Sequence, residues 1–210
     1  MIGRLVIDSS DVISDLCIIG RNTNTDKSPY NTVGHRHPYT GVYSMLFAPL
    51  KTNPVRFAEI GVAMGASALL WDEYFTNENT QLHLFDRDQT LLDNSRALTG
   101  PRVKYALMDV AEDGDIRRAL GNEEYDVILD DTTHRHADQI RIIHEAFPLL
   151  KRGGMLIVED VFRNTPEDDY TSKLQDIIPK CSNAYFVVCE HKWRWSPGWD
   201  NDKLLVLVKG

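Results

Sequence analysis

The chain has 210 residues, of which 42% are hydrophobic and 26% are charged, a composition that predicts one globular domain with a sizeable buried core. Its formal net charge of -8 argues against a nucleic-acid or anionic-membrane partner, because both attract proteins through a basic surface. The cysteines Cys17, Cys181 and Cys189 have neither a CxxC nor a Cys/His spacing, so they indicate neither a disulfide framework nor a zinc site.

The N-terminal sequence MIGRLVIDSSDVISDLCIIG carries acidic residues through its apolar stretch. It stays short of the roughly 18 apolar residues that would span a bilayer. We therefore expect a cytoplasmic protein with no signal peptide and no membrane span.

Residues 1–52 are expected to form a helical and loop cap on a core of residues 53–210, all within one domain. A first helix is predicted over about residues 10–19, capped by Asp8, Ser9 and Ser10 and ended by Gly20. A polar, turn-rich stretch follows to Pro38. A second helix is predicted over about residues 40–48.

From residue 55 onward, short apolar runs of strand length alternate with amphipathic stretches of helix length. This alternation predicts a mostly parallel sheet with helices on both faces. The predicted strands are residues 55–62, 82–86, 103–109, 125–131 and 153–160, and the predicted helices are residues 66–75, 89–100, 115–120, 136–150 and 170–179. No helix separates residues 184–192 from residues 203–209, so we expect these last two strands to form an antiparallel hairpin.

The first strand-to-helix turn is the expected ligand site, because open parallel sheets bind ligands at the carboxyl ends of their strands. It contains Glu59, Gly61 and Gly65, and the helix that starts near residue 66 offers free N–H groups to an anion. The turn is neither the GxGxxG fingerprint of dinucleotide sites nor a GxxxxGK[ST] phosphate loop. Asp86 and Asp109 end the next two strands, where they could meet a ribose and an adenine.

This arrangement resembles the class I S-adenosylmethionine-dependent methyltransferases, whose ExGxxxG loop and ribose-binding acid match Glu59, Gly61, Gly65 and Asp86. The resemblance covers roughly residues 55–210. It implies a Rossmann-like sheet of seven strands in the order 3-2-1-4-5-7-6, with the last strand antiparallel. The residues expected to bind S-adenosylmethionine are Glu59, Gly61, Gly65, Ser67, Asp86, Asp109 and Asp130.

Acidic side chains also follow the fourth and fifth strands of the predicted core. Asp131, Glu159 and Asp160 should lie side by side, and uncompensated carboxylates repel one another unless a cation neutralises them. Oxygen ligands favour Mg²⁺ or a similar ion, which would make a bound hydroxyl more acidic. His134 is positioned by sequence to accept that hydroxyl's proton near neutral pH.

The DDxxH and ED segments resemble the metal-dependent sugar O-methyltransferases, such as the macrocin, mycinamicin and rhamnosyl O-methyltransferases. The resemblance implies Asp131, Glu159 and Asp160 as metal ligands and His134 as general base, while Thr132 replaces a glycine common in that family. Thr25-Asp26-Lys27 and the segment from His37 to Tyr43 resemble further family motifs. They imply that the N-terminal segment folds over the site and that Tyr39 meets the substrate.

Trp193, Trp195 and Trp199 lie in the loop between the last two strands and form a candidate platform for an acceptor sugar, because sugar C–H groups pack on indole faces. A metal that binds two neighbouring hydroxyls would suit a deoxysugar or a catechol, and the family resemblance implies a deoxysugar such as rhamnose, free or on a glycan. The alternatives are a catechol-type methyltransferase, disfavoured because Glu159-Asp160 replaces the usual aspartate-asparagine pair, and a noncatalytic cofactor-binding domain of a larger glycan-assembling protein. A metal-dependent hydrolase would leave Glu59, Gly61 and Asp86 without a role.

Overall fold

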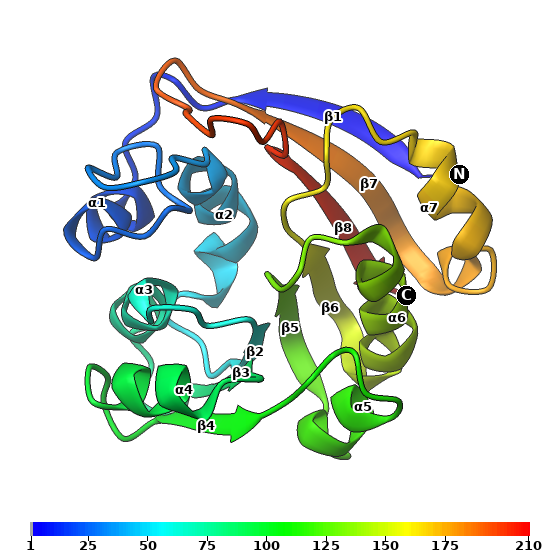
Figure 1. Ribbon diagram of the computed structural model, residues 1–210, viewed down its shortest axis with the longest axis horizontal. Coiled ribbons are helices and arrows are strands. Elements are labelled where there is room, and N and C mark those ends of the chain that lie inside the picture. The colour runs from blue at the N-terminus through cyan, green and yellow to red at the C-terminus, as the bar shows by residue number, and fades with distance from the viewer. Residues whose placement is uncertain (1) are drawn as a thin grey trace.

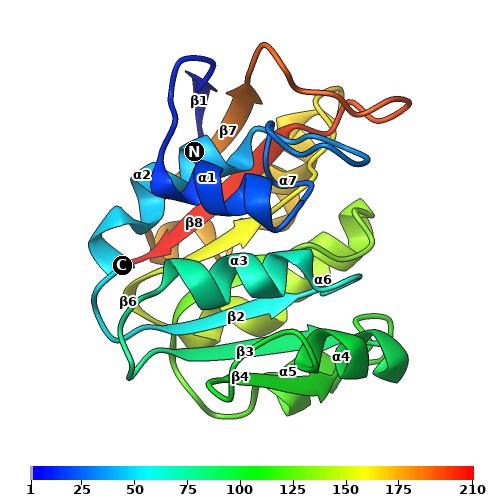
Figure 2. The same cartoon turned by 90° about the vertical axis from the view of Figure 1, so that its left-hand side faces the viewer.

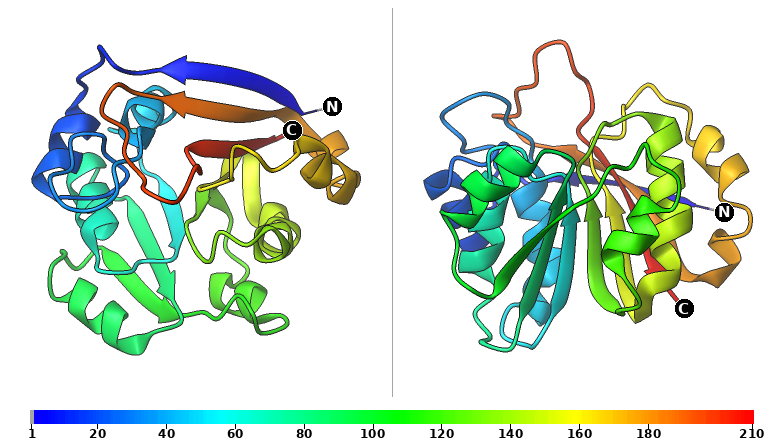
Figure 3. Two further views of the ribbon diagram at one scale, coloured as in Figure 1. Left: turned by 45° about the horizontal axis from the view of Figure 1, so that its top comes forward. Right: turned by 60° about the horizontal axis from the view of Figure 1, so that its bottom comes forward.

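An eight-stranded sheet runs through the middle of the computed structural model, which describes residues 2–210 (Figure 1). The strand order is β1-β7-β8-β6-β5-β2-β3-β4, and β8 is antiparallel to both of its neighbours. Helices α1 to α4 cover one face, and α5 to α7 cover the other (Figures 1 and 3).

The elements follow the predicted alternation. The strands are β1 (Gly3–Asp8), β2 (Arg56–Ile60), β3 (Gln81–Asp86), β4 (Val103–Leu107), β5 (Tyr125–Asp130), β6 (Leu150–Val158), β7 (Cys181–Glu190) and β8 (Lys203–Lys209). The helices are α1 (Asp15–Asn22), α2 (Tyr39–Phe47), α3 (Ala66–Tyr74), α4 (Gln89–Arg96), α5 (Asp115–Leu120), α6 (His136–Ala146) and α7 (Glu167–Lys173), with 3-10 turns at Ala48–Leu50, Phe147–Leu149 and Ile178–Lys180.

Both faces of the sheet are apolar because both are covered. In β8, Leu204 and Val206 belong to the apolar layer beneath α1 to α3, whereas Leu205 and Leu207 belong to the layer beneath α6 and α7. Alternate residues of a strand point to opposite faces, so a strand buried on both sides reads as a continuous apolar run. The run KLLVLVK follows this rule.

The predicted order of seven strands is confirmed from β4 through to β7, and so is the terminal antiparallel hairpin. The predicted number of strands is wrong, because β1 adds an eighth strand at the edge of the sheet. All six residues of β1 pair in parallel with β7, from Gly3 opposite Tyr185 to Asp8 opposite Glu190. The N-terminal segment is therefore part of the sheet as well as a cap.

The predicted limits of the first helix are also wrong. Helix α1 begins after Ser14, whose side chain accepts a hydrogen bond from the Cys17 amide, and not after the Asp8 to Ser10 cluster. It continues past Gly20 to Asn22, because Gly20 serves a close approach rather than a helix end. A Cβ on Gly20 would lie 3.0 Å from side-chain atoms of both Ser28 and Thr40. Helix α2 lies within one residue of its predicted limits.

The topology gathers the carboxyl ends of the parallel strands at one edge of the sheet. Ile60 at the end of β2 pairs with Phe85 on one side and with Asp130 on the other, and Asp130 pairs with Val158. The segment that joins α1 to α2 lies at the same end of the sheet as these strand ends (Figure 2). Between residues 2 and 210, no helix has the length and apolar character needed to cross a membrane.

Candidate active site

The turn after β2 is built around two glycines with left-handed backbone. Gly61 has a φ of 98° and Gly65 a φ of 82°, a region that glycine adopts without steric cost. A Cβ on Gly61 would collide with the carbonyl oxygen of Asp131, and one on Gly65 would lie 2.6 Å from Ser95 Oγ. The two glycines therefore let the turn approach both the β5 end and α4.

We expect Gly61→Ala to lower the free energy of unfolding by about 2–5 kcal/mol, through left-handed backbone strain and the collision with Asp131 together. It should also abolish high-affinity nucleoside binding at this turn. Gly153→Ala is the matched control, because Gly153 has a φ of 80° but open space around its Cβ position. Urea unfolding of both variants checks the prediction, and equal losses would contradict the role of the close approach.

A pocket of 260 Å³ opens at the carboxyl ends of β2 to β5. Its lining includes Gly61, Asp86, Asp109 and Asp131, four of the residues singled out in the sequence. Asp86 Oδ2 accepts hydrogen bonds from the amides of Val62, at 2.9 Å, and Ala63, at 3.2 Å, and so fixes the turn after β2. The pocket has apolar walls and carboxylates at successive strand ends, which suits a nucleoside.

The other predicted cofactor residues do not line this pocket. Glu59 is fully buried, and Ser67 Oγ donates to its Oε2 at 2.8 Å. Gly65 begins α3, and Asp130 Oδ1 accepts from Thr132. Asp130 Oδ2 has no hydrogen-bond partner among the described residues, and burial raises the pKa of Asp130 to about 7. These residues lie behind the pocket wall, and their predicted contact with a cofactor stays a prediction.

Burial also raises the pKa of Glu59 to about 7, although Lys27 opposes the shift. Between pH 4.5 and about 7, the folded protein keeps a proton that unfolded Glu59 has released. The free energy of unfolding should therefore fall as pH rises through this window, by about 3 kcal/mol from this group.

Urea unfolding at pH 5 and pH 8, in the presence of a chelator, measures this difference. In Glu59→Gln the residue cannot titrate, so the decline should shrink by about the same 3 kcal/mol. An unchanged decline in the variant would contradict the raised pKa.

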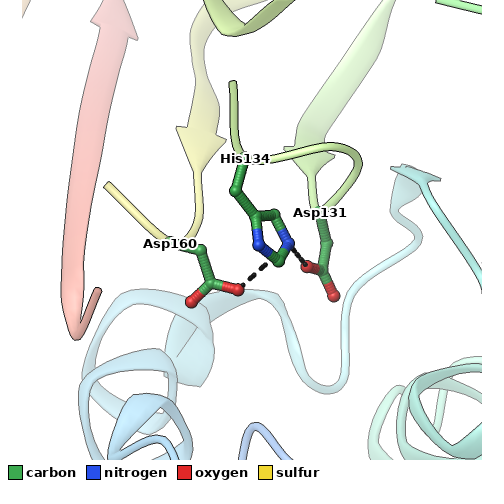
Figure 4. A group of neighbouring side chains, drawn as sticks. All are labelled: Asp131, His134 and Asp160. Atoms are coloured by element: carbon green, nitrogen blue, oxygen red, sulfur yellow. Dashed lines mark hydrogen bonds and ion pairs between the residues drawn. The ribbon is translucent and has the colours of Figure 1, made fainter. Parts of the chain in front are cut away.

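Asp131, His134 and Asp160 form the most concentrated group of metal-ligating atoms at this edge (Figure 4). His134 Nε2 lies 3.3 Å from Asp131 Oδ1 and 3.2 Å from Asp160 Oδ2. His134 and Asp160 both have left-handed backbone, with φ values of 58° and 56°. Such strain in residues other than glycine clusters at functional sites.

Opposing effects set the protonation of this group. Burial disfavours the charged imidazole, but the hydrogen bond to Asp131 and the charge of Asp160 outweigh burial and raise the pKa of His134 to about 9. Burial likewise raises the pKa of Asp160. For Asp131, Lys27 and His134 outweigh burial and hold its pKa well below the usual value.

Lys27 is a functional residue that the charge argument from the sequence missed. Its ammonium group is buried against Asp131, 2.6 Å from Glu159 Oε2 and 3.4 Å from Glu59 Oε1. The carboxylates at this edge are thus partly compensated by the protein itself, contrary to the premise from which a metal was predicted. The resemblance of Thr25-Asp26-Lys27 to a family motif was the sequence feature that indicated this segment reaches the site.

Two tyrosines of α2 hold the carboxylates that follow β6. Tyr43 donates to Glu159 Oε1, and Tyr39 donates to Asp160 Oδ1 at 2.6 Å and to the Asn201 carbonyl at 3.0 Å. Tyr39 is buried, so it contacts the site through Asp160. Lys27 and Tyr43 occupy both oxygens of Glu159, and its role as a metal ligand stays a prediction.

The three tryptophans of the β7–β8 loop separate into two places. The Trp199 ring lies edge-on to His134, with centroids 6.0 Å apart, and stacks on Phe162. Trp193 and Trp195 instead line a groove with the segment between α1 and α2. Of the predicted sugar platform, Trp199 is the tryptophan that borders His134.

Comparison with known proteins agrees with this geometry. Residues 58–161 match the family model described as a methyltransferase domain. The chain carries a methyltransferase domain. The match begins within β2 and ends just after Asp160, so this methyltransferase domain includes the glycine turn, the pocket and the Asp131, His134 and Asp160 group.

Curated relatives of the methyltransferase domain act on sugar groups. An 8-demethyl-8-alpha-L-rhamnosyl tetracenomycin-C 2'-O-methyltransferase of Streptomyces olivaceus is 31% identical over 135 residues, which cover 60% of this chain and 33% of the relative. An L-olivosyl-oleandolide 3-O-methyltransferase of Streptomyces antibioticus is 30% identical over 138 residues, which cover 61% of this chain and 34% of the relative. The chain therefore spans about a third of the length of these relatives.

A solved structure shares the fold of the methyltransferase domain. The MycE methyltransferase of the mycinamycin biosynthetic pathway, solved in complex with Mg and SAH, superposes with a TM-score of 0.66 at 19% identity. The superposition covers 95% of this chain and 55% of that one.

Proposed function

We propose that the chain is an S-adenosylmethionine- and divalent-metal-dependent O-methyltransferase that methylates a sugar hydroxyl, with a deoxysugar such as rhamnose as the acceptor. The observation that carries the proposal is His134 Nε2 between Asp131 and Asp160, beside a pocket that Asp131 also lines. The relatives named above, which methylate rhamnosyl and olivosyl groups, support the acceptor class.

The residues at this edge fit a divalent ion. The ligand atoms of Asp131, His134 and Asp160 all lie within 4.8 Å of one another, close enough to share one ion. Asp131 and Asp160 supply the carboxylate oxygens that Mg²⁺ and Mn²⁺ prefer. Glu159 is the predicted third ligand, and it would have to exchange its bond with Lys27.

The 260 Å³ pocket at the carboxyl ends of β2 to β5 is the proposed site of S-adenosylmethionine. Gly61 and Asp86 both line this pocket, and Asp86 is the proposed partner of the ribose hydroxyls. When bound, the cofactor supplies an electrophilic methyl group, and the metal ion lowers the pKa of a neighbouring hydroxyl.

His134 receives the proton that leaves the acceptor hydroxyl as the oxygen–methyl bond forms and the sulfur–methyl bond breaks. The carboxylates that raise the pKa of His134 are the proposed metal ligands. A bound cation would counter their charge and lower the pKa of His134, which would leave the imidazole available as a base. The remaining task of the protein is to hold both reactants in line.

The test is methyl transfer from S-adenosylmethionine to an α-L-rhamnoside, measured with Mg²⁺, with a chelator, and with a catechol in place of the sugar. We expect transfer to the rhamnoside that needs Mg²⁺, and calorimetric binding of the cofactor. Cofactor binding with equal transfer in chelator would overturn the metal role. Preference for the catechol would overturn the acceptor class, and absence of cofactor binding would overturn the methyltransferase activity.

A further inference from the structure

We infer that the groove lined by Trp193 and Trp195 is a second saccharide site, which binds the part of a glycan acceptor beyond the methylated sugar and prefers a unit with an anionic group. We call it the tryptophan groove. It is formed by the β7–β8 loop and by the segment between α1 and α2, which lie side by side (Figure 3). The inference rests on the proposed function, because it extends the acceptor of that reaction.

Both indoles line the groove, and Trp193 is placed there by a turn in which the Arg194 N–H donates to the His191 carbonyl at 3.1 Å. Arg194, which lies between them, turns the other way and donates to Asp202 at 2.8 Å. Trp193 and Trp195 remain 49% and 47% exposed, and Lys192 Nζ and the Arg36 guanidinium group lie over their rings, 5.4 and 5.5 Å from the respective centroids.

The groove is rigid where it would bind. Arg36 and Trp195 exchange two main-chain hydrogen bonds, of 2.8 and 3.0 Å, which join the two walls. Tyr30 packs edge-on against Trp193, with centroids 5.3 Å apart. Asn31 is buried and donates to the carbonyls of Val33 and His35, so the opposite wall is also braced. Preformed aromatic faces bind sugars at low entropic cost.

The charge of the groove differs from that of the molecule. Arg21 and Arg36 both line it, and neither makes an ion pair with any residue from 2 to 210. Arg194 on the reverse side is by contrast paired with Glu190, Asp200 and Asp202. Two uncompensated guanidinium groups in a chain of net charge -8 favour a carboxylate or phosphate on the ligand.

The position suits an extended acceptor. Arg36 lies in the groove, and Tyr39, three residues later, donates to Asp160 at the catalytic group. His37, between these two residues, has its Nδ1 3.8 Å from Asp160 Oδ1 and 3.4 Å from Ser196 Oγ, so the groove wall adjoins the site. The groove has a volume of 630 Å³, within the range that holds a disaccharide. A glycan whose terminal sugar reaches His134 would extend from there towards the tryptophan groove.

Calorimetry of the chain, without cofactor or metal, tests binding apart from turnover. The probes are one rhamnose-terminated trisaccharide with an internal uronic acid, the same trisaccharide with that acid reduced to the alcohol, and its phosphorylated analogue. We expect the two anionic probes to bind about tenfold more tightly than the neutral one. The stronger anionic probe then distinguishes a carboxylate from a phosphate ligand.

Three variants test the groove itself. Trp195→Ala should weaken binding of every probe about tenfold, whereas Trp195→Phe, which keeps an aromatic face, should stay within about threefold. Arg36→Gln should weaken only the anionic probes, and Arg152→Gln, an exposed arginine on β6, should change nothing. Wild-type binding of all probes by Trp195→Ala would overturn the site, and equal affinity for neutral and anionic probes would overturn its charge preference.

Turnover separates this inference from the proposed function. Trp195→Ala should raise KM for the trisaccharide about tenfold and leave kcat, and KM for a simple rhamnoside, unchanged. Saccharide binding without methyl transfer to any acceptor would remove the proposed function and keep the groove. Transfer with equal KM for both acceptors in wild type and variant would keep the function and remove the groove.

Discussion

His134→Ala is expected to lower kcat by about 10²–10⁴-fold, the usual contribution of a positioned general base. The same variant should bind Mg²⁺ with an affinity within a few-fold of wild type, because Asp131 and Asp160 are the proposed ligands. Single-turnover methyl transfer and calorimetric titration of Mg²⁺ measure the two quantities separately. Both measurements are needed, because His134 lies close enough to Asp131 and Asp160 to be a ligand of the same metal ion instead of the base.

The matched control for this variant is His144→Ala. His144 lies on α6, two turns beyond the site, and its ring contacts the Lys173 carbonyl. If His134→Ala loses Mg²⁺ affinity in proportion to kcat, then His134 is a ligand and another group is the base. The His136 ring, at the start of α6, packs edge-on against Tyr170, with centroids 4.6 Å apart.

The parallel core could be predicted from the sequence because its signals are local. Each strand is a short apolar run, and each turn at its carboxyl end carries a glycine or an acid, so Gly61, Asp86 and Asp131 could be brought to one edge by topology alone. That they line one pocket could be predicted without knowledge of how their side chains are oriented. Edge strand β1 has no such signal, because its pairing partner β7 lies far along the chain and its two faces are exposed.

The contacts of the N-terminal segment could not be predicted for a related reason. Lys27 is 104 residues from Asp131 and 132 residues from Glu159, and no periodicity relates them. Only the resemblance of the Thr25 to Lys27 motif indicated that this segment reaches the site. The sequence also could not predict that the tryptophans lie in two places. The path of the β7–β8 loop decides that Trp199 contacts His134 while Trp195 lines the groove.

Lys27→Met should be the most destabilising of these changes. It removes the ammonium group that contacts Asp131, Glu159 and Glu59 and so takes away the positive charge beside these buried carboxylates. Breaking a buried ion pair from one side costs about 3–5 kcal/mol. We expect the free energy of unfolding, measured with urea at pH 8 in chelator, to fall by this amount. In thermal unfolding, Tm should fall by about 2–4 °C per kcal/mol.

The sign of the pH dependence identifies the cause. Without Lys27 the pKa values of Asp131, Glu159 and Glu59 should all rise, so these carboxylates take up protons as pH falls and the destabilisation should shrink towards pH 5. Mg²⁺ should stabilise the variant more than the wild type, since the ion restores positive charge beside Asp131. Lys104→Met, an exposed lysine on β4, controls for the substitution itself. A loss that is equal at pH 5 and pH 8 would mean that Lys27 acts through packing of its alkyl chain, and the electrostatic account of this site would fail.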